Sequence, residues 1–164
     1  MAAGERHRHR GFTYLGVLFL VALLGLALGA AGQAWSVASQ RAREQELLWV
    51  GTQYARALQS YAQQSPGRPE YPRRLEDLLT DNRFPVPRHH LRRLYPDPIT
   101  RSTDWGLVKT LDGRISGVYS RSEAAPWKRA NFPLRWEAFT DSRKYSDWKF
   151  GADTRLPAGQ PEKG

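Results

Sequence analysis

The sequence predicts an α+β protein in which one long N-terminal helix packs on a small antiparallel sheet. Three observations lead to this prediction. No proline occurs between positions 12 and 65, although the whole chain has 11 prolines. Apolar residues in the second half of that stretch recur every three or four positions, as they do on one face of a helix. Two strand-like runs follow on either side of Asp112-Gly113, a pair typical of a hairpin turn.

The first forty residues divide into a basic leader and an apolar segment. The leader, residues 1–11, carries positive charge at Arg6, Arg8 and Arg10. Residues 12–40 contain no charged side chain, and their first part is apolar for about the 20 residues that a helix needs to cross a bilayer. Positive charge before such a segment holds the N-terminus in the cytoplasm. We therefore expect residues 12–40 to form the transmembrane half of the long helix, with the remainder of the chain outside.

The helical pattern continues through residues 41–64. The expected buried face consists of Leu47, Val50, Gly51, Tyr54, Leu58, Tyr61 and Ala62. The opposite face consists of Arg41, Arg43, Glu44, Gln45, Gln53, Arg56 and Gln59. An amphipathic helix gains most of its stability from packing, so this half is expected to carry the head. Two helices with a break at residues 29–32 remain an alternative, because glycine lowers helix propensity there.

Residues 65–103 are expected to connect the helix to the sheet. Pro66 cannot continue a helix, and Gly67 favours a turn. Residues 71–79 then have the spacing of a short helix, with their leucines on one face.

Residues 104–150 are expected to form a small β-rich head. Its hairpin strands are predicted at residues 105–110 and 115–120, and a third strand at residues 145–150. A two-stranded hairpin alone is marginally stable, so we expect the sheet to pack on the amphipathic half of the helix. The other predicted elements are a short helix over residues 134–144 and a disordered tail over residues 151–164.

The junction between leader and apolar segment reads Arg10-Gly11-Phe12-Thr13-Tyr14-Leu15, with no spacer before the apolar run. It resembles the signal of type IV prepilins. The resemblance implies that a prepilin peptidase cuts between Gly11 and Phe12 and that Phe12 becomes N-methylated. It also implies that the apolar helix stays on the protein and packs in the core of a filament.

A second resemblance lies in the connecting region. Tyr71-Pro72 followed by spaced leucines, a basic stretch, Asp97-Pro98 and Trp105-Gly106 is similar to the corresponding loop of major pseudopilins of type II secretion. One position departs from the family: Gly16 stands where pilins carry a glutamate. That carboxylate pairs with the N-terminus of a neighbouring subunit, so its absence removes one contact of filament assembly.

The pilin-like resemblance implies a structural subunit of a type II secretion pseudopilus, and not an enzyme. Its expected partners are other pseudopilins, the prepilin peptidase and the inner-membrane assembly platform. Its expected location is the bacterial inner membrane, crossed once, with a cytoplasmic N-terminus and a periplasmic head.

Other interpretations remain open at the level of sequence. The chain fits a minor type IV pilin of a pilus or DNA-uptake machine. It also fits a periplasmic domain behind a conventional signal peptide cut near residues 30–32, or an unrelated domain with a permanent anchor. The mature N-terminus distinguishes these cases.

The chemistry available to the chain is limited by composition. There is no cysteine, which excludes disulfides, cysteine zinc sites and a thiol nucleophile. The net charge of +9 favours anionic partners of some kind. One dense basic stretch is the candidate contact for an anion or a partner, with nucleic acid the less expected one: Arg88, His89, His90, Arg92 and Arg93.

No cofactor is expected. Asp141 and Asp147 are the only candidates for a Ca²⁺ site, as in the heads of some major pseudopilins, and they lack the dense spacing of oxygen ligands that Ca²⁺ prefers. No other metal site is predicted.

Overall fold

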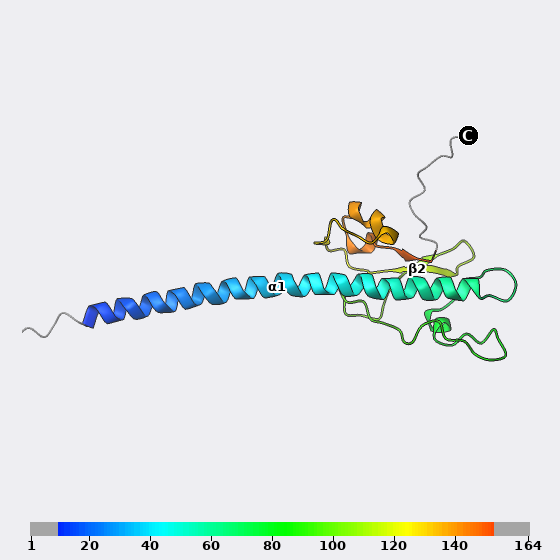
Figure 1. The fold of residues 1–164 in the computed structure, drawn as a ribbon, viewed down its shortest axis with the longest axis horizontal. Coiled ribbons are helices and arrows are strands. Elements are labelled where there is room, and N and C mark those ends of the chain that lie inside the picture. Colours follow the sequence, from blue (N-terminus) through cyan, green and yellow to red (C-terminus); the bar gives the residue numbers. More distant parts are fainter. Residues whose placement is uncertain (1–9, 153–164) are drawn as a thin grey trace, which may run out of the picture. The chain divides into compact units, whose positions relative to one another are not determined.

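The computed structural model describes the backbone of residues 10–152 and the side chains of residues 14–28 and 35–152. The described chain is α+β, with helices and a small three-stranded antiparallel sheet (Figure 1). The predicted fold class is therefore confirmed at this level. The chain divides into two compact units, one ending at Gln40 and the other beginning at Arg41.

The longest element is α1 (Arg10–Gln63). It confirms in part the prediction of one long N-terminal helix, and the proposed break at residues 29–32 is not seen in the backbone. The absence of proline accounts for the unbroken hydrogen-bond ladder. The basic residues Arg6 and Arg8 and most of the predicted tail lie outside the described residues.

In the first unit, the described apolar side chains are exposed. Leu26 and Leu28 each keep 73% of their surface, and Phe19 keeps 67%. Over the ranges that the structure describes, no helix is long and apolar enough to cross a membrane. This finding contradicts the predicted location as a single-pass inner-membrane protein.

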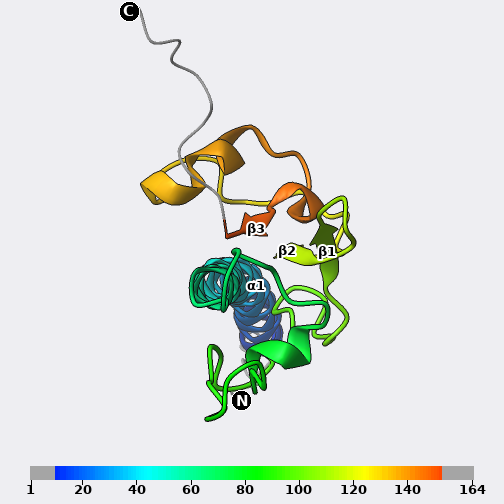
Figure 2. The ribbon, with the colours of Figure 1, turned by 90° about the vertical axis from the view of Figure 1, so that its right-hand side faces the viewer.

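The sheet of the second unit has the order β1 (Gly106–Lys109), β2 (Ile115–Tyr119), β3 (Phe150–Gly151), with both pairs antiparallel (Figure 2). The hairpin between β1 and β2 turns where the sequence predicts it. Gly113 adopts a φ of +78°, which favours glycine, and its N–H donates to the Thr110 carbonyl oxygen at 2.9 Å.

Three short 3₁₀ helices complete the second unit: η1 (Leu75–Leu78), η2 (Leu134–Asp141) and η3 (Tyr145–Asp147). The first two lie within predicted helices. The third takes the place of the first half of the predicted third strand, of which only Phe150, at β3, is assigned to a strand. The reason is local: the Asp147 carboxylate accepts the backbone N–H groups of Arg143 and Lys144, at 3.2 and 3.1 Å, which favours a tight turn.

The core of the second unit lies between α1 and the sheet. The apolar face predicted for α1 is buried, and Leu47, Tyr54 and Leu58 are fully inaccessible. Phe150 of β3 comes so close to α1 that a Cβ on Gly51 would lie 2.3 Å from its ring. Figure 2 shows α1 and the segment containing η2 and η3 on opposite sides of β3. Four aromatic rings of that segment are also buried: Trp136, Phe139, Tyr145 and Trp148. The indole N–H of Trp136 reaches α1, where it donates to the Thr52 hydroxyl at 3.0 Å.

Candidate functional site

The predicted processing site lies at the start of α1. Arg10, Gly11 and Phe12 belong to the helix backbone, and their side chains are outside the described residues. Gly16 is described, and a Cβ placed there would meet nothing within 4 Å. The first unit therefore offers an open apolar helix surface, with no carboxylate at the position where pilins have one.

The basic stretch predicted to form one anion contact is divided by the fold. Arg88 donates to the Gln64 side-chain oxygen at 2.8 Å, and its guanidinium lies 4.2 Å from the centre of the Phe84 ring. His89 bonds the Leu79 carbonyl oxygen. The Arg93 guanidinium lies 4.9 Å from the centre of the Tyr95 ring. Arg88 and Arg93 are thus held by separate neighbours, whereas His89, His90 and Arg92 line one cavity together with Trp49 and Tyr95.

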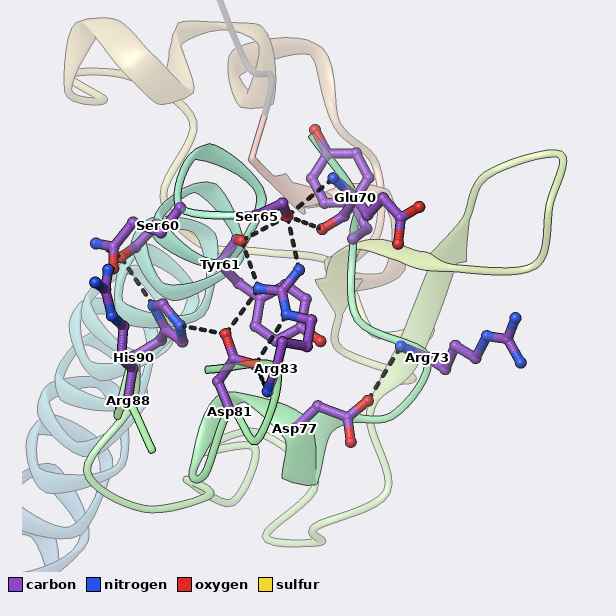
Figure 3. Close-up of polar contacts among 12 residues, drawn as sticks. Ser60, Tyr61, Ser65, Glu70, Arg73, Asp77, Asp81, Arg83, Arg88 and His90 are labelled. Carbon is purple, nitrogen blue, oxygen red and sulfur yellow. Dashed lines mark hydrogen bonds and ion pairs between the residues drawn. The ribbon is translucent and has the colours of Figure 1, made fainter. Parts of the chain in front are cut away.

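His90 turns inward, so its prediction as an exposed contact is not supported. Its side chain is 2% exposed. Its Nδ1 lies 2.9 Å from the Ser60 hydroxyl, and its Nε2 lies 3.3 Å from the Asp81 carboxylate (Figure 3). The histidine thereby joins the last turns of α1 to the connecting region.

Arg83 is the centre of the same network. It donates from Nε to Asp81 Oδ1 at 2.8 Å and from Nη2 to Asp81 Oδ2 at 2.7 Å (Figure 3). It also donates to the Ser65 hydroxyl at 2.7 Å and to the Tyr61 carbonyl oxygen at 2.9 Å, which lie at the end of α1. The hydrogen bonds from Arg83 lower the pKa of the Asp81 carboxyl to about 2.

Ser60, His90 and Asp81 place a hydroxyl, an imidazole and a carboxylate in contact one after another, as in the catalytic triad of a hydrolase. The arrangement differs from a nucleophilic site in two respects. The Asp81 carboxylate already carries two hydrogen bonds from Arg83, and the imidazole is enclosed. The network therefore has a structural role: its hydrogen bonds hold the connecting region against α1.

Two further buried carboxylates hold loops of the head. Glu44, which is 2% exposed, accepts the N–H of Trp127 at 2.6 Å and the hydroxyl of Tyr145 at 2.7 Å. Asp97, which is fully buried, accepts the hydroxyl of Ser120 at 2.6 Å and the N–H of Ile99 at 2.9 Å.

Sequence reasoning assigned Glu44 to the solvent face of α1, and the structure corrects this. A signal was present, because position 44 extends the buried series at 47, 51, 54 and 58 backwards with the same spacing of three and four. Glu44 was nevertheless assigned to the solvent face, because a charged side chain is not expected on a buried helix face. Asp81 and Asp97 had no such periodic signal, since they lie in irregular backbone.

Tyr54, in the last part of α1, binds the connecting region through two hydrogen bonds. Its hydroxyl donates to the Tyr95 carbonyl oxygen at 3.0 Å and accepts the Tyr95 N–H at 2.9 Å. Burial raises the pKa of this hydroxyl to about 12, so it stays protonated and keeps both roles.

The candidate Ca²⁺ ligands do not form a cluster. Asp147 is engaged by the two backbone N–H groups before η3, and Asp141 is an exposed residue at the end of η2. Within the described part of the chain, no group of three or more His, Asp or Glu side chains is placed to hold a metal ion.

Comparisons with known proteins add no neighbour: no family model, curated protein or solved structure matches the chain.

Proposed function

We propose that this chain is a pilin-like structural subunit of a type II secretion pseudopilus and that it works by assembly. The observation that carries the proposal is the apolar side of α1 over residues 14–28, where every large hydrophobic side chain is at least 47% exposed. Such a surface needs cover, and identical helices of neighbouring subunits provide it. Burying one exposed leucine fully contributes about 1.5–3 kcal/mol, so several per subunit favour assembly strongly.

The fold of the second unit supports the same proposal. The amphipathic half of α1 is the spine of the head core, on which the antiparallel sheet packs. The resemblance implies an arrangement of this kind, which supports the proposal. The apolar side chains of residues 14–28 are exposed, whereas most of those of residues 47–62 are buried in the head. Such a helix suits a subunit whose first half packs in a filament and whose second half carries the head on the filament surface.

The first test is the mature N-terminus, measured by intact mass in cells with and without a prepilin peptidase. We expect a chain that begins at N-methylated Phe12 only when the peptidase is present. Gly11→Val is expected to block the cut, and Gly16→Val is the matched control, because the backbone at Gly16 has open space around it. A chain that begins near residue 32, or one that keeps Met1, contradicts the proposal.

The second test probes assembly directly. The chain has no native cysteine, so an introduced thiol is the only one. Leu20→Cys, at a position 57% exposed on α1, is expected to give cross-linked dimers after oxidation in cells that assemble the filament. Leu134→Cys, at a 75% exposed position on η2, is the control and is expected to remain monomeric. Equal cross-linking of the two variants speaks against packing through α1.

A further inference from the structure

A cavity of about 420 Å³ opens where the second unit begins. It lies between the first turn of α1 in this unit and the loop of residues 127–131. Arg41 lines it from the helix, and Lys128 and Arg129 line it from the loop. The volume falls in the range of sites that take a small group or a few side chains.

Three basic side chains and one carboxylate line this cavity, so its net charge is positive. The only acidic residue in its lining is Glu44, which is 2% exposed. Its carboxylate oxygens accept the backbone N–H groups of Trp127 and Lys128 and the Tyr145 hydroxyl, so they face the protein. Among the ion pairs found in the described residues, none includes Arg41, Lys128 or Arg129.

The loop that carries two of these cations is held in place before any ligand arrives. Lys128 N–H reaches both Glu44 oxygens, at 3.3 and 3.2 Å. Pro126 is buried, and Asn131 turns the chain with a φ of +58°. A fixed backbone reduces the ordering cost of binding. Trp127 stands at the cavity with 55% of its surface exposed and offers a flat apolar wall beside the charges.

We propose that this cavity is a docking site for an acidic segment of a partner protein. Carboxylates of the partner would lie against Arg41, Lys128 and Arg129, and an apolar side chain would contact Trp127. The inference does not depend on the filament proposal, because every residue that carries it belongs to the second unit.

Charge identifies the kind of partner. A second copy of this chain carries the same net charge of +9, so an acidic partner of different sequence complements the charge of this cavity better. Nucleic acid is a poorer fit, because its backbone requires an extended basic track. The cations here are gathered around one cavity, and the basic residues of the connecting region are held elsewhere.

The test measures binding of a fluorescein-labelled peptide of six glutamates to the full chain by anisotropy, in a mild non-ionic detergent that covers residues 14–28. The pocket variant is Arg41→Gln, Lys128→Gln, Arg129→Gln. The control is Arg68→Gln, Arg73→Gln, Arg143→Gln, which removes the same charge from three other exposed positions. We expect the pocket variant to raise the Kd at least about tenfold and the control to raise it about twofold at most.

Equal losses in the two triple variants overturn the proposal, because they indicate diffuse attraction only. It is also overturned if inorganic phosphate binds the cavity more tightly than the peptide, or if a twelve-nucleotide oligothymidine does so with the same dependence on the three cations. If the triple variant does not fold, as judged by circular dichroism, the single substitution Arg129→Gln replaces it, with an expected loss of about threefold.

Discussion

Three buried carboxylates hold the loops of the second unit in place through hydrogen bonds. Glu44, Asp81 and Asp97 are each 2% exposed or less, and each accepts several hydrogen bonds. Those to Glu44 come from a distant segment, whereas Asp81 and Asp97 are bonded mostly by residues close to them in the chain. Burying a charge is costly unless its oxygens are paired, and here they are. Removing one such group leaves buried donors unsatisfied, which costs about 1–3 kcal/mol each.

The Asp81 carboxylate makes stability depend on pH. Its folded pKa, about 2, lies below the value of about 4 in an unfolded chain, so its contribution is complete above pH 4 and is lost as the pH falls through 2. The contribution is about 2 kcal/mol. We expect Asp81→Asn to lower the free energy of urea unfolding at pH 6 and to flatten its decline between pH 6 and pH 3.

The matched control for this prediction is Asp104→Asn. Asp104 is 68% exposed and pairs with Arg121 at the surface, so its removal is expected to change unfolding by well under 1 kcal/mol. An unchanged pH slope in Asp81→Asn would sink the assignment of acid sensitivity to this network.

Sequence reasoning at the residue scale identified the apolar side chains better than the polar ones. Leu47, Tyr54 and Leu58 follow helical spacing, and all three are buried as predicted. Glu44 and His90 were assigned to the surface because of their charge. Their burial depends on hydrogen-bond partners that are brought close only by the fold, 83 positions away in the case of Trp127.

At the scale of elements, α1 and β3 are in close contact. Gly51 permits it, since any side chain at this position would enter the Phe150 ring. The ring cannot easily move, because Trp136 and Phe139 lie with their ring centres 5.0 and 5.2 Å from it. A glycine that weakens the helix locally thus allows the helix and the sheet to pack closely.

Gly51→Ala should therefore destabilise the head by about 1–3 kcal/mol, the usual cost of overpacking, even though alanine is the better helix former. Gly25→Ala is the control in the same helix. No atom lies within 4 Å of a Cβ placed at Gly25, so alanine there should be neutral or slightly stabilising. Thermal unfolding followed by circular dichroism measures both. A Gly51→Ala variant as stable as the parent would mean that α1 and β3 are not in close contact.

The elements themselves were predicted unequally. The hairpin was located correctly because Asp112-Gly113 specifies its turn locally. The region of residues 145–150 is rich in aromatic side chains, which favours a strand, yet it forms η3 before the short β3. Hydrogen bonds from the backbone to Asp147 outweigh β propensity there, since propensity is a weak preference that tertiary context overrides.

At the scale of the whole molecule, the two units differ in what stabilises them. The helix in the second unit is packed on a core, whereas residues 14–28 rely on helix propensity and on whatever covers them. Regions with few buried contacts open more readily than cores.

We expect hydrogen exchange to report this difference in dilute protein without detergent. Amides of residues 47–62 should exchange at least about 100-fold more slowly than those of residues 14–28, because global unfolding is required to expose them. Protection of residues 14–28 should rise with protein concentration as copies cover one another, while that of residues 47–62 should not change. Full protection of residues 14–28 at the lowest concentration would show that their helix is stable without neighbours.

Glu44 fixes the backbone of its loop by hydrogen bonds that do not involve the side chains of residues 127 and 128. It bonds main-chain N–H groups at residues 127 and 128, which every residue except proline provides. The path of the loop therefore depends little on the side chains of residues 127–130. These residues can be replaced, in evolution or by grafting a foreign epitope, while the backbone that presents them stays the same, provided that Asn131 keeps its φ of +58°.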